Sequence, residues 1–214
     1  MDSTPALPAH NQSVSESLFT RAQAVMPSGY TRHLAVAKPF PIYADHADGC
    51  WITDVEGNRK IDWINNFSAL IHGHNKREII DVLSAQAARL MSAVLPTEWE
   101  VDLAEILCAR IPSIERVRFM NSGTEANQIA VKAARAYTGK SGIAKMEGGY
   151  HGQFDLLEAS FHSTPENWGD PRRPNATAYQ VGHPQELLDL VTVLPLNDIE
   201  AARDIVRAES DQLA

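Results

Sequence analysis

Three consecutive residues, Ser122, Gly123 and Thr124, have the types expected at an anion site, because they open a predicted helix at 124–137. The first turn of a helix leaves backbone N–H groups without partners at the positive end of the helix dipole. Glycine lets a ligand approach the backbone closely, and two hydroxyls add donors. The segment predicts a phosphate site. The same residues also suit an ordinary helix cap, with Ser122 or Thr124 as N-cap and Glu125 in the first turn.

A second segment, EGGYHG at 147–152, follows a predicted strand and places Tyr150 and His151 among three glycines. Such a backbone can hold an aromatic ring against a flat ligand. Parallel sheets bind ligands at the carboxyl ends of their strands, and both segments follow predicted strand ends. Taken singly, Tyr150 also fits loop packing and His151 also fits a satisfied loop histidine. Together, the two segments predict a planar, phosphorylated ligand.

Two other motifs imitate known sites but lack necessary parts. The stretch TGKS at 138–141 resembles the end of a P-loop, yet Ala134 stands where that motif needs glycine, and the stretch follows a helix instead of a strand. His72 and His74 resemble a metal-binding pair, but the sequence offers no carboxylate or cysteine to complete the set. We therefore expect packing or capping roles for these histidines and no metal site.

Hydrophobic spacing and turn residues predict the elements that position these segments. Helices are expected at 15–26, 78–91, 98–110, 124–137 and 198–208, strands at 42–44, 50–54, 59–64, 116–120, 142–146 and 190–194, and a long loop at 163–184. The early strands form an antiparallel meander. From residue 116 strands and helices alternate, which indicates an α/β fold with a mainly parallel sheet flanked by helices.

Composition narrows the classes of protein. The 214 residues are 44% hydrophobic, enough for a sizeable core. A net charge of −8 disfavours nucleic-acid binding, and the sequence has neither an apolar run long enough to cross a membrane nor a secretory signal. Two cysteines far apart in the sequence, Cys50 and Cys108, are expected to be free thiols. These features favour a cytoplasmic protein.

The string NSGTEANQIAVKAARAYTGKSGIAKMEGGYHG at 121–152 resembles the signature region of class III aminotransferases and of the related glutamate-1-semialdehyde aminomutases. GCWITDVEGNRKIDWINN, GHNKREI, VRFMNSGTEAN and VTVLPLND resemble further segments of that family. The resemblance implies the fold type I architecture of pyridoxal phosphate (PLP) enzymes, truncated here. It implies that 1–72 form an N-terminal arm and part of the small domain, and that 73–214 form the first, incomplete part of the large PLP-binding domain.

The resemblance also assigns the site residues. It implies a PLP site with Ser122, Gly123 and Thr124 around the phosphate, Tyr150 stacked on the pyridine ring and His151 beside it. Arg32, in PSGYTRH, matches the place where some β-amino-acid aminotransferases hold the substrate carboxylate, a group that suits the guanidinium fork. Arg32 fits an ordinary surface arginine equally well.

Two departures from the family pattern affect the expected activity. Lys76 and Arg77 stand where the family usually has a histidine and a proline. Relatives continue beyond the position of Ala214 into an aspartate that pairs with the pyridinium nitrogen and a lysine that forms the Schiff base. None of the lysines here has that sequence context. We therefore expect a portion of a longer enzyme that has no catalytic residue of its own and is inactive alone.

Three functions remain open at this point. The resemblance implies an aminotransferase that moves an amino group between an amino acid or amine and a 2-oxo acid, as a homodimer in its full-length form. A glutamate-semialdehyde type of aminomutase would share the same cofactor site. A non-catalytic remnant that keeps only the phosphate site would need no further residues.

Overall fold

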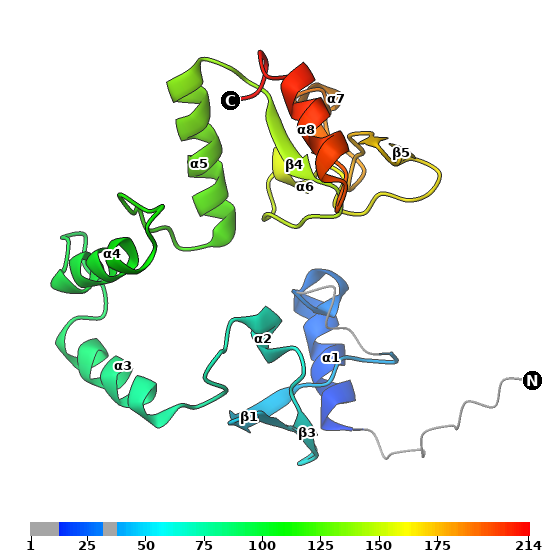
Figure 1. Cartoon of the computed structure of the whole chain (residues 1–214). Helices are drawn as coiled ribbons and strands as arrows, with labels where there is room; N and C mark the ends of the chain where they lie inside the picture. Colours follow the sequence, from blue (N-terminus) through cyan, green and yellow to red (C-terminus); the bar gives the residue numbers. More distant parts are fainter. Residues whose placement is uncertain (1–12, 32–37) are drawn as a thin grey trace, which may run out of the picture. The chain divides into compact units, whose positions relative to one another are not determined.

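The structure is a computed structural model that describes residues 13–31 and 38–214 (Figure 1). These residues form two compact units, one that ends at Pro96 and one that spans Thr97–Ala214. The domain boundary expected after residue 72 refers to the domains of the family, and it stays a prediction. No helix in 13–31 or 38–214 is long and apolar enough to cross a membrane.

The first unit contains a small antiparallel sheet and four helical segments. Its elements are α1 (Val14–Val25), η1 (Pro27–Gly29), β1 (Ala44–Asp48), β2 (Trp51–Asp54), β3 (Arg59–Ile61), α2 (Asn65–Ser68) and α3 (Arg77–Arg89). The strands pair in the order β1-β2-β3, which confirms the predicted meander. The first strand begins at Ala44, two residues later than expected.

His74 has a structural role in this unit. Its Nε2 lies 2.7 Å from Asp62 Oδ2, and its backbone exchanges two hydrogen bonds with Gly49. Asp62 is thus a carboxylate partner of His74 that the spacing of the two histidines did not indicate. These bonds join His74 to the turn between β1 and β2 at Gly49 and to Asp62, which directly follows β3.

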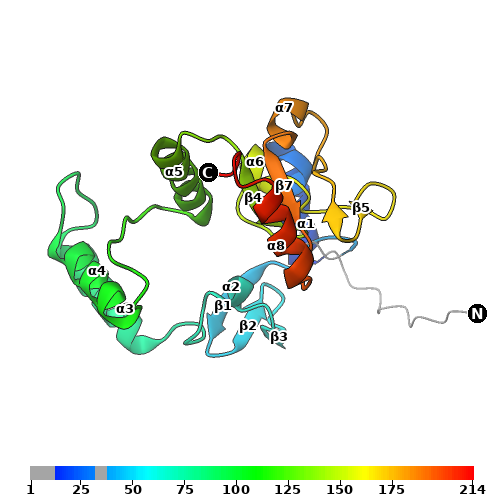
Figure 2. The ribbon, with the colours of Figure 1, turned by 45° about the horizontal axis from the view of Figure 1, so that its top comes forward.

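The second unit is built on a pair of parallel strands. Its elements are α4 (Glu98–Arg110), α5 (Gly123–Thr138), β4 (Ile143–Met146), α6 (Asp155–Glu158), β5 (Gly169–Asp170), β6 (Arg173–Pro174), α7 (Gln185–Leu188), β7 (Val191–Leu194) and α8 (Ile199–Ala208). β4 and β7 pair in parallel from Ile143↔Val191 to Met146↔Leu194. The helix α8 lies against β7 (Figure 2).

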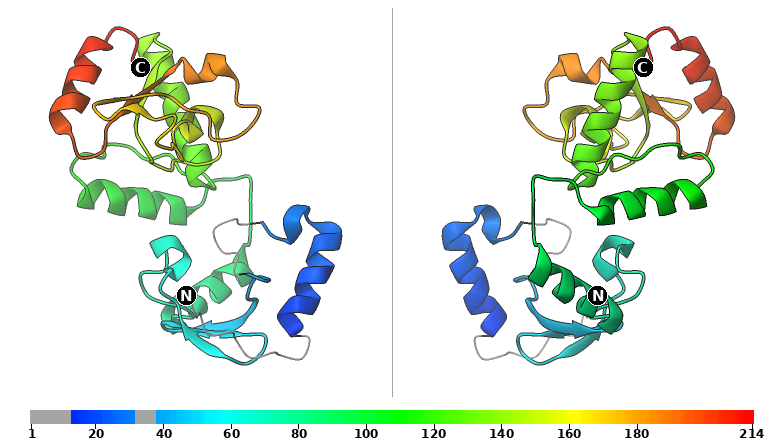
Figure 3. Two further views of the ribbon diagram at one scale, coloured as in Figure 1. Left: turned by 90° about the vertical axis from the view of Figure 1, so that its right-hand side faces the viewer. Right: turned by 90° about the vertical axis from the view of Figure 1, so that its left-hand side faces the viewer.

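The core of this unit lies around the two parallel strands. Its buried residues are Ile143, Leu156, Leu157, Ala159, Leu188, Val191 and Val193. The helix α5 runs beside β4 and contributes Val131 to the edge of this cluster (Figure 3). These contacts join the helix that opens at Gly123 to the strand that precedes the EGGYHG segment.

The strand expected at 116–120 is absent, and this expectation was wrong. Those residues carry no strand assignment, although the segment is apolar enough for one. A strand requires a neighbour that accepts and donates its backbone hydrogen bonds. Within the part of the chain that the structure describes, no segment pairs with 116–120. The long loop at 163–184 is also interrupted, by the short antiparallel pair β5–β6.

Candidate functional site

The start of α5 combines a helix cap with open N–H donors. Ser122 is the N-cap, and its Oγ accepts a hydrogen bond of 3.2 Å from the Glu125 amide. Its carbonyl accepts the Ala126 amide at 3.0 Å. The amides of Gly123 and Thr124 have no acceptor among the described residues, and Gly123 is exposed. The predicted cap is therefore present and uses one amide, while the amides of Gly123 and Thr124 are left without a protein acceptor, as an anion site requires. The anion site itself stays a prediction.

Hydrogen bonds tie the EGGYHG segment to this helix start. The Gln153 amide donates to Thr124 Oγ1 at 3.1 Å, and Asn127 Nδ2 donates to the carbonyl oxygen of His151 at 2.9 Å. The two segments therefore meet, as expected, although the first does not follow a strand.

Gly152 makes the closest approach between the two segments. It is buried and has a φ of +103°, which favours glycine. A Cβ at this position would lie 2.5 Å from Thr124 Oγ1 and 2.7 Å from Thr124 Cα. Only glycine fits here, so the loop carrying Tyr150 and His151 is seated directly on the first turn of α5.

Tyr150 points out of the core. Its side chain is 57% exposed, and its ring packs against Phe161 with centroids 5.1 Å apart and an interplanar angle of 54°. The aromatic face and the open amides of α5 are therefore both accessible to a ligand. The roles that the resemblance assigns to Tyr150 and to the three residues at 122–124 stay predictions.

His151 lies beside a buried lysine. Burial lowers the pKa of His151, and the positive charge of Lys145 lowers it further, so the imidazole is neutral near pH 7. Lys145 is 4% exposed, and its Nζ donates to the carbonyl oxygen of Ala159. Burial lowers the pKa of Lys145 to about 8. A neutral imidazole can accept or donate one hydrogen bond without adding charge beside an aromatic platform.

The hydroxyls of the predicted phosphate site already have protein partners. The Ser122 hydroxyl lies 3.4 Å from Glu125 Oε2, and Thr124 Oγ1 accepts from Gln153. The Ser122 hydroxyl has therefore used its one proton, whereas the Thr124 hydroxyl keeps its proton and the amides of Gly123 and Thr124 have no acceptor among the described residues. Arg32, the predicted substrate residue, lies outside the described residues.

Three residues of this arrangement were missed from the sequence: Asn127, Lys145 and Gln153. Asn127 lies one helical turn after Thr124, on the same side of α5, and this spacing is the signal that could have found it. Lys145 lies two residues after Ile143 in a predicted strand, so the two side chains share a face of the sheet, and this spacing is the signal for its burial. Gln153 acts through its backbone amide, so its side chain gives no signal at all.

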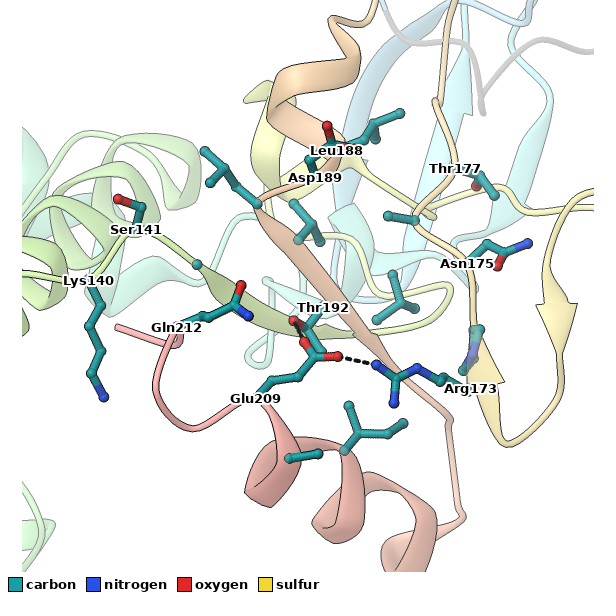
Figure 4. A pocket seen from close by; sticks show the side chains of 18 of the residues that line it. Lys140, Ser141, Arg173, Asn175, Thr177, Leu188, Asp189, Thr192, Glu209 and Gln212 are labelled. Carbon is teal, nitrogen blue, oxygen red and sulfur yellow. Dashed lines mark hydrogen bonds and ion pairs between the residues drawn. The ribbon is translucent and has the colours of Figure 1, made fainter.

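A large hollow elsewhere in the second unit is lined by none of the predicted residues. It has a volume of about 1040 Å³ and lies between β6, β7 and α8 (Figure 4). The charges at its centre pair with each other: Arg173 bonds Glu209, which also accepts the Thr192 hydroxyl. A ligand there would have to displace these pairs, whereas the start of α5 offers donors already open.

Comparisons with known proteins identify the family. The sequence model of the class III aminotransferases matches residues 34–186. Glutamate-1-semialdehyde 2,1-aminomutase of Natronomonas pharaonis is 38% identical over 206 residues, which cover 95% of this chain and 44% of that protein. A crystal structure of an omega-transaminase from Sphaerobacter thermophilus is 44% identical, with a TM-score of 0.89, over 94% of this chain and 46% of that one. A transaminase solved with PLP bound is 36% identical, with a TM-score of 0.85, over 96% and 46%.

The architecture is therefore that of the fold type I transaminases, which confirms the predicted fold class. The chain belongs to the class III aminotransferase family. It spans just under half the length of the relatives it matches.

Proposed function

We propose that this chain provides the phosphate and ring contacts for PLP in an aminotransferase that moves an amino group between an amino acid or amine and a 2-oxo acid. One observation carries the proposal. Two open amides, those of Gly123 and Thr124, begin a helix onto which the loop bearing the exposed Tyr150 is hydrogen bonded. A phosphate monoester joined to a flat ring matches this pairing of donors and aromatic face.

The residues present fit the cofactor. The phosphate would accept hydrogen bonds from the amides of Gly123 and Thr124 and from the Thr124 hydroxyl, whose proton has no acceptor among the described residues. The Ser122 hydroxyl would donate to the phosphate only in place of its bond to Glu125 Oε2. A Cβ built on Gly123 meets nothing within 4 Å, so the approach to these amides is open. Tyr150 would lie against the pyridine ring, with the neutral His151 beside it. When bound, PLP supplies the electron sink that amino-group transfer needs.

What this chain does for the reaction is to fix the position of the cofactor. Amides at a helix start are rigid donors, and the hydrogen bonds from Gln153 and Asn127 hold the loop at a set place on that helix. Positioning of this kind lowers the entropy cost of reaction without moving a proton.

Amino-group transfer also needs a group that moves a proton, and we assign that role to no residue of this chain. Lys145 is the buried amine in this unit, but its Nζ is held by the Ala159 carbonyl. We therefore propose that the 214-residue chain alone has no aminotransferase turnover. PLP-dependent conversion of a 2-oxo acid by this polypeptide, at a rate above that of free PLP, would contradict this.

A substitution at Gly123 tests the cofactor site without relying on turnover. Gly123 is the first residue of α5, where proline is tolerated, and Ser122 before it has the extended φ of −150° and ψ of 161° that a following proline requires. Gly123→Pro therefore removes one N–H and leaves the helix intact. The matched control, Gly123→Ala, keeps the N–H and has space for its methyl group.

The Kd for PLP is measured by titration of the PLP absorbance, with inorganic phosphate as competitor. We expect Gly123→Pro to raise the Kd about tenfold, because a hydrogen bond to a charged phosphate is lost. Gly123→Ala should bind as the parent does. Equal affinities for the two variants would remove the α5 amides from the site, and the proposal with them.

An aminomutase is the second candidate, because a curated relative at 38% identity carries that activity. It would use the same cofactor contacts, so the Gly123 variants do not separate the two. The assay that distinguishes the two activities uses a longer protein, in which this chain is joined to the second half found in its relatives. Transfer of the amino group to an added 2-oxo acid indicates an aminotransferase, and isomerisation of glutamate-1-semialdehyde without such an acceptor indicates an aminomutase. A non-catalytic remnant would give neither reaction.

The small-molecule partners, the homodimer and the cytoplasmic location follow from the family resemblance and composition alone. We propose them on that basis. Size measurement of the same longer protein in solution tests the dimer.

A further inference from the structure

The orientation of the Tyr150 ring depends on few contacts. The residue lies in a loop between glycines, and Gly148 and Gly152 both have positive φ values, of +67° and +103°. Its side chain is 57% exposed, and among the described residues its hydroxyl bonds to nothing. Within 13–31 and 38–214, the ring that packs against it is that of Phe161, with centroids 5.1 Å apart. An exposed ring on a glycine-rich loop needs such a support to keep one tilt.

Phe161 is itself held from another side. Its ring packs against Tyr179 at 5.4 Å and 58°, and against His162 at 4.4 Å and 54°. These tilted arrangements suit the charge distribution of aromatic rings. Tyr150, Phe161 and Tyr179 therefore form a row in which the central ring restrains the outer two.

Ser160 fixes the backbone from which Phe161 projects. It is fully buried, and its φ of +54° is unusual for a residue with a side chain. All its polar groups are bonded. Its amide donates to the Thr177 carbonyl at 2.9 Å, and its carbonyl accepts the Gly148 amide at 2.9 Å. Its Oγ donates to the Asn175 carbonyl at 2.9 Å and accepts the Thr177 amide at 3.0 Å.

Ser160 therefore joins three segments. One is the turn after β4, through Gly148, in the loop that carries Tyr150. Another is the segment 175–177, which leads to Tyr179. The third is its own segment, which carries Phe161. Five hydrogen bonds on one buried residue, including one of 3.4 Å from the Thr177 hydroxyl, hold the backbone segments that carry the three rings in a fixed relation.

We propose that Phe161 and Ser160 are positioning residues for the Tyr150 ring: Phe161 sets the tilt of the ring, and Ser160 fixes the backbone that presents Phe161. This inference rests on the proposed role of Tyr150 as the platform for the pyridine ring. It predicts that the two residues act on the ring of a ligand and leave the binding of its phosphate unchanged.

The test measures binding of the ring and binding of the phosphate separately. Affinities for PLP and for inorganic phosphate are measured for the parent chain and for Phe161→Leu, Phe161→Tyr and Ser160→Gly. Leucine keeps apolar volume without a ring, and tyrosine restores the ring. Glycine keeps the positive φ and removes only the Oγ bonds. We expect Phe161→Leu and Ser160→Gly to raise the Kd for PLP about three- to tenfold, with the Kd for phosphate unchanged and Phe161→Tyr close to the parent.

A second measurement does not need the cofactor. In chain labelled with ¹³C-tyrosine, the ring signal of Tyr150, assigned with Tyr150→Phe, should shift when Phe161→Leu removes the neighbouring ring current. Phe161→Tyr should restore it. If the parent chain does not bind PLP, the proposed function fails, and the Tyr150 signal still decides the positioning role.

Three results would overturn the inference. The first is a Tyr150 signal unmoved by Phe161→Leu. The second is PLP affinity unchanged in both Phe161→Leu and Ser160→Gly, although the parent binds PLP. The third is an equal loss of PLP and phosphate affinity, which would mean that these residues act on the fold as a whole.

Discussion

The body around β4 and β7 and the two helices α3 and α4 bury very different shares of their apolar side chains. In the body, Leu156 is 1% exposed and Val193 is 3% exposed. In α3 and α4 no residue is buried, and Leu83 and Val101 are 59% and 53% exposed. The body is therefore stabilised by packing, whereas the two helices must rely on local interactions.

The difference shows what an amphipathic pattern can and cannot predict. Both helices formed where the hydrophobic spacing placed them, and α4 spans 98–110 as expected. The spacing predicts that a helix has an apolar face, but not which part of the protein covers it. In the body, residues of β4, α6, α7 and β7 pack into one buried cluster and cover one another. Substitutions in the body and in the two helices test this difference.

Gly152→Ala should have the largest effect, because Gly152 lies where α5 meets the body. The substitution adds an unfavourable positive φ and a methyl group 2.5 Å from Thr124 Oγ1. We expect a loss of about 4 kcal/mol in the free energy of unfolding, measured by urea denaturation, and faster hydrogen exchange in the first turns of α5.

The matched control for this change is Gly148→Ala in the same loop. Gly148 has a similar φ of +67°, but nothing lies within 4 Å of its Cβ position. It should lose only about 1 kcal/mol, the cost of the strained φ. If both variants lose the same amount, the close contact between Gly152 and Thr124 is not what joins α5 to the body.

Leu156→Ala comes next, and it tests the comparison directly. Removing a fully buried leucine from the body should cost about 3 kcal/mol, from lost burial and the cavity left behind. Val101→Ala, on the exposed face of α4, should cost at most about 0.5 kcal/mol. Both values come from the same denaturation experiment. A large loss at Val101 would show that α4 is covered in solution.

The same contrast explains which features of the fold could be predicted from the sequence. The five longer helices, the meander at β1–β3 and the strands β4 and β7 were predicted, whereas the short elements η1, α2, α6, α7, β5 and β6 were not. The strand at 116–120 was not found, because a strand depends on a partner and its own residues do not specify one. Hydrophobic periodicity is a property of one segment, whereas strand pairing depends on two segments.

The candidate site divides in a similar way. Gly123 and Tyr150 could be found because a glycine at a helix start and an aromatic residue among glycines are signals in the residue types themselves. The join between the segments could not, because it uses the backbone amide of Gln153, the backbone carbonyl of His151 and the missing Cβ of Gly152. Interactions of the backbone leave little trace in the sequence.

Lys145→Met should remove a pH dependence of the free energy of unfolding that comes from the buried lysine in the body. The pKa of the buried Lys145 is lowered to about 8, below its value of 10.5 in an unfolded chain. Between these pH values the unfolded state binds a proton that the folded state does not, so the free energy of unfolding rises with pH across this window. The rise should be on the order of 2–3 kcal/mol.

The measurement is urea denaturation of the parent chain and its variants at several values between pH 7 and pH 11. Lys145→Met should lack the rise contributed by this lysine. The exposed Lys132, on α5, provides the control. Lys132→Met should keep the pH profile of the parent, so that a flattened profile in both variants would argue against a buried charge at Lys145.

Thr97→Ala should have a small effect on stability, and it tests whether α4 depends on local interactions. Thr97 and Glu100 form a capping box in which the Thr97 amide donates to Glu100 Oε1 at 2.9 Å. Losing the threonine side chain should cost about 1 kcal/mol. Because packing does not compensate, the loss should appear as unfolding of α4 alone, seen as faster hydrogen exchange of its amides with protection of β4 and β7 unchanged.

Ser122→Ala removes the corresponding cap from α5, which Val131 and Asn127 join to the body. Its amides should therefore lose less protection, and an equal loss in both helices would show that these contacts do not support α5.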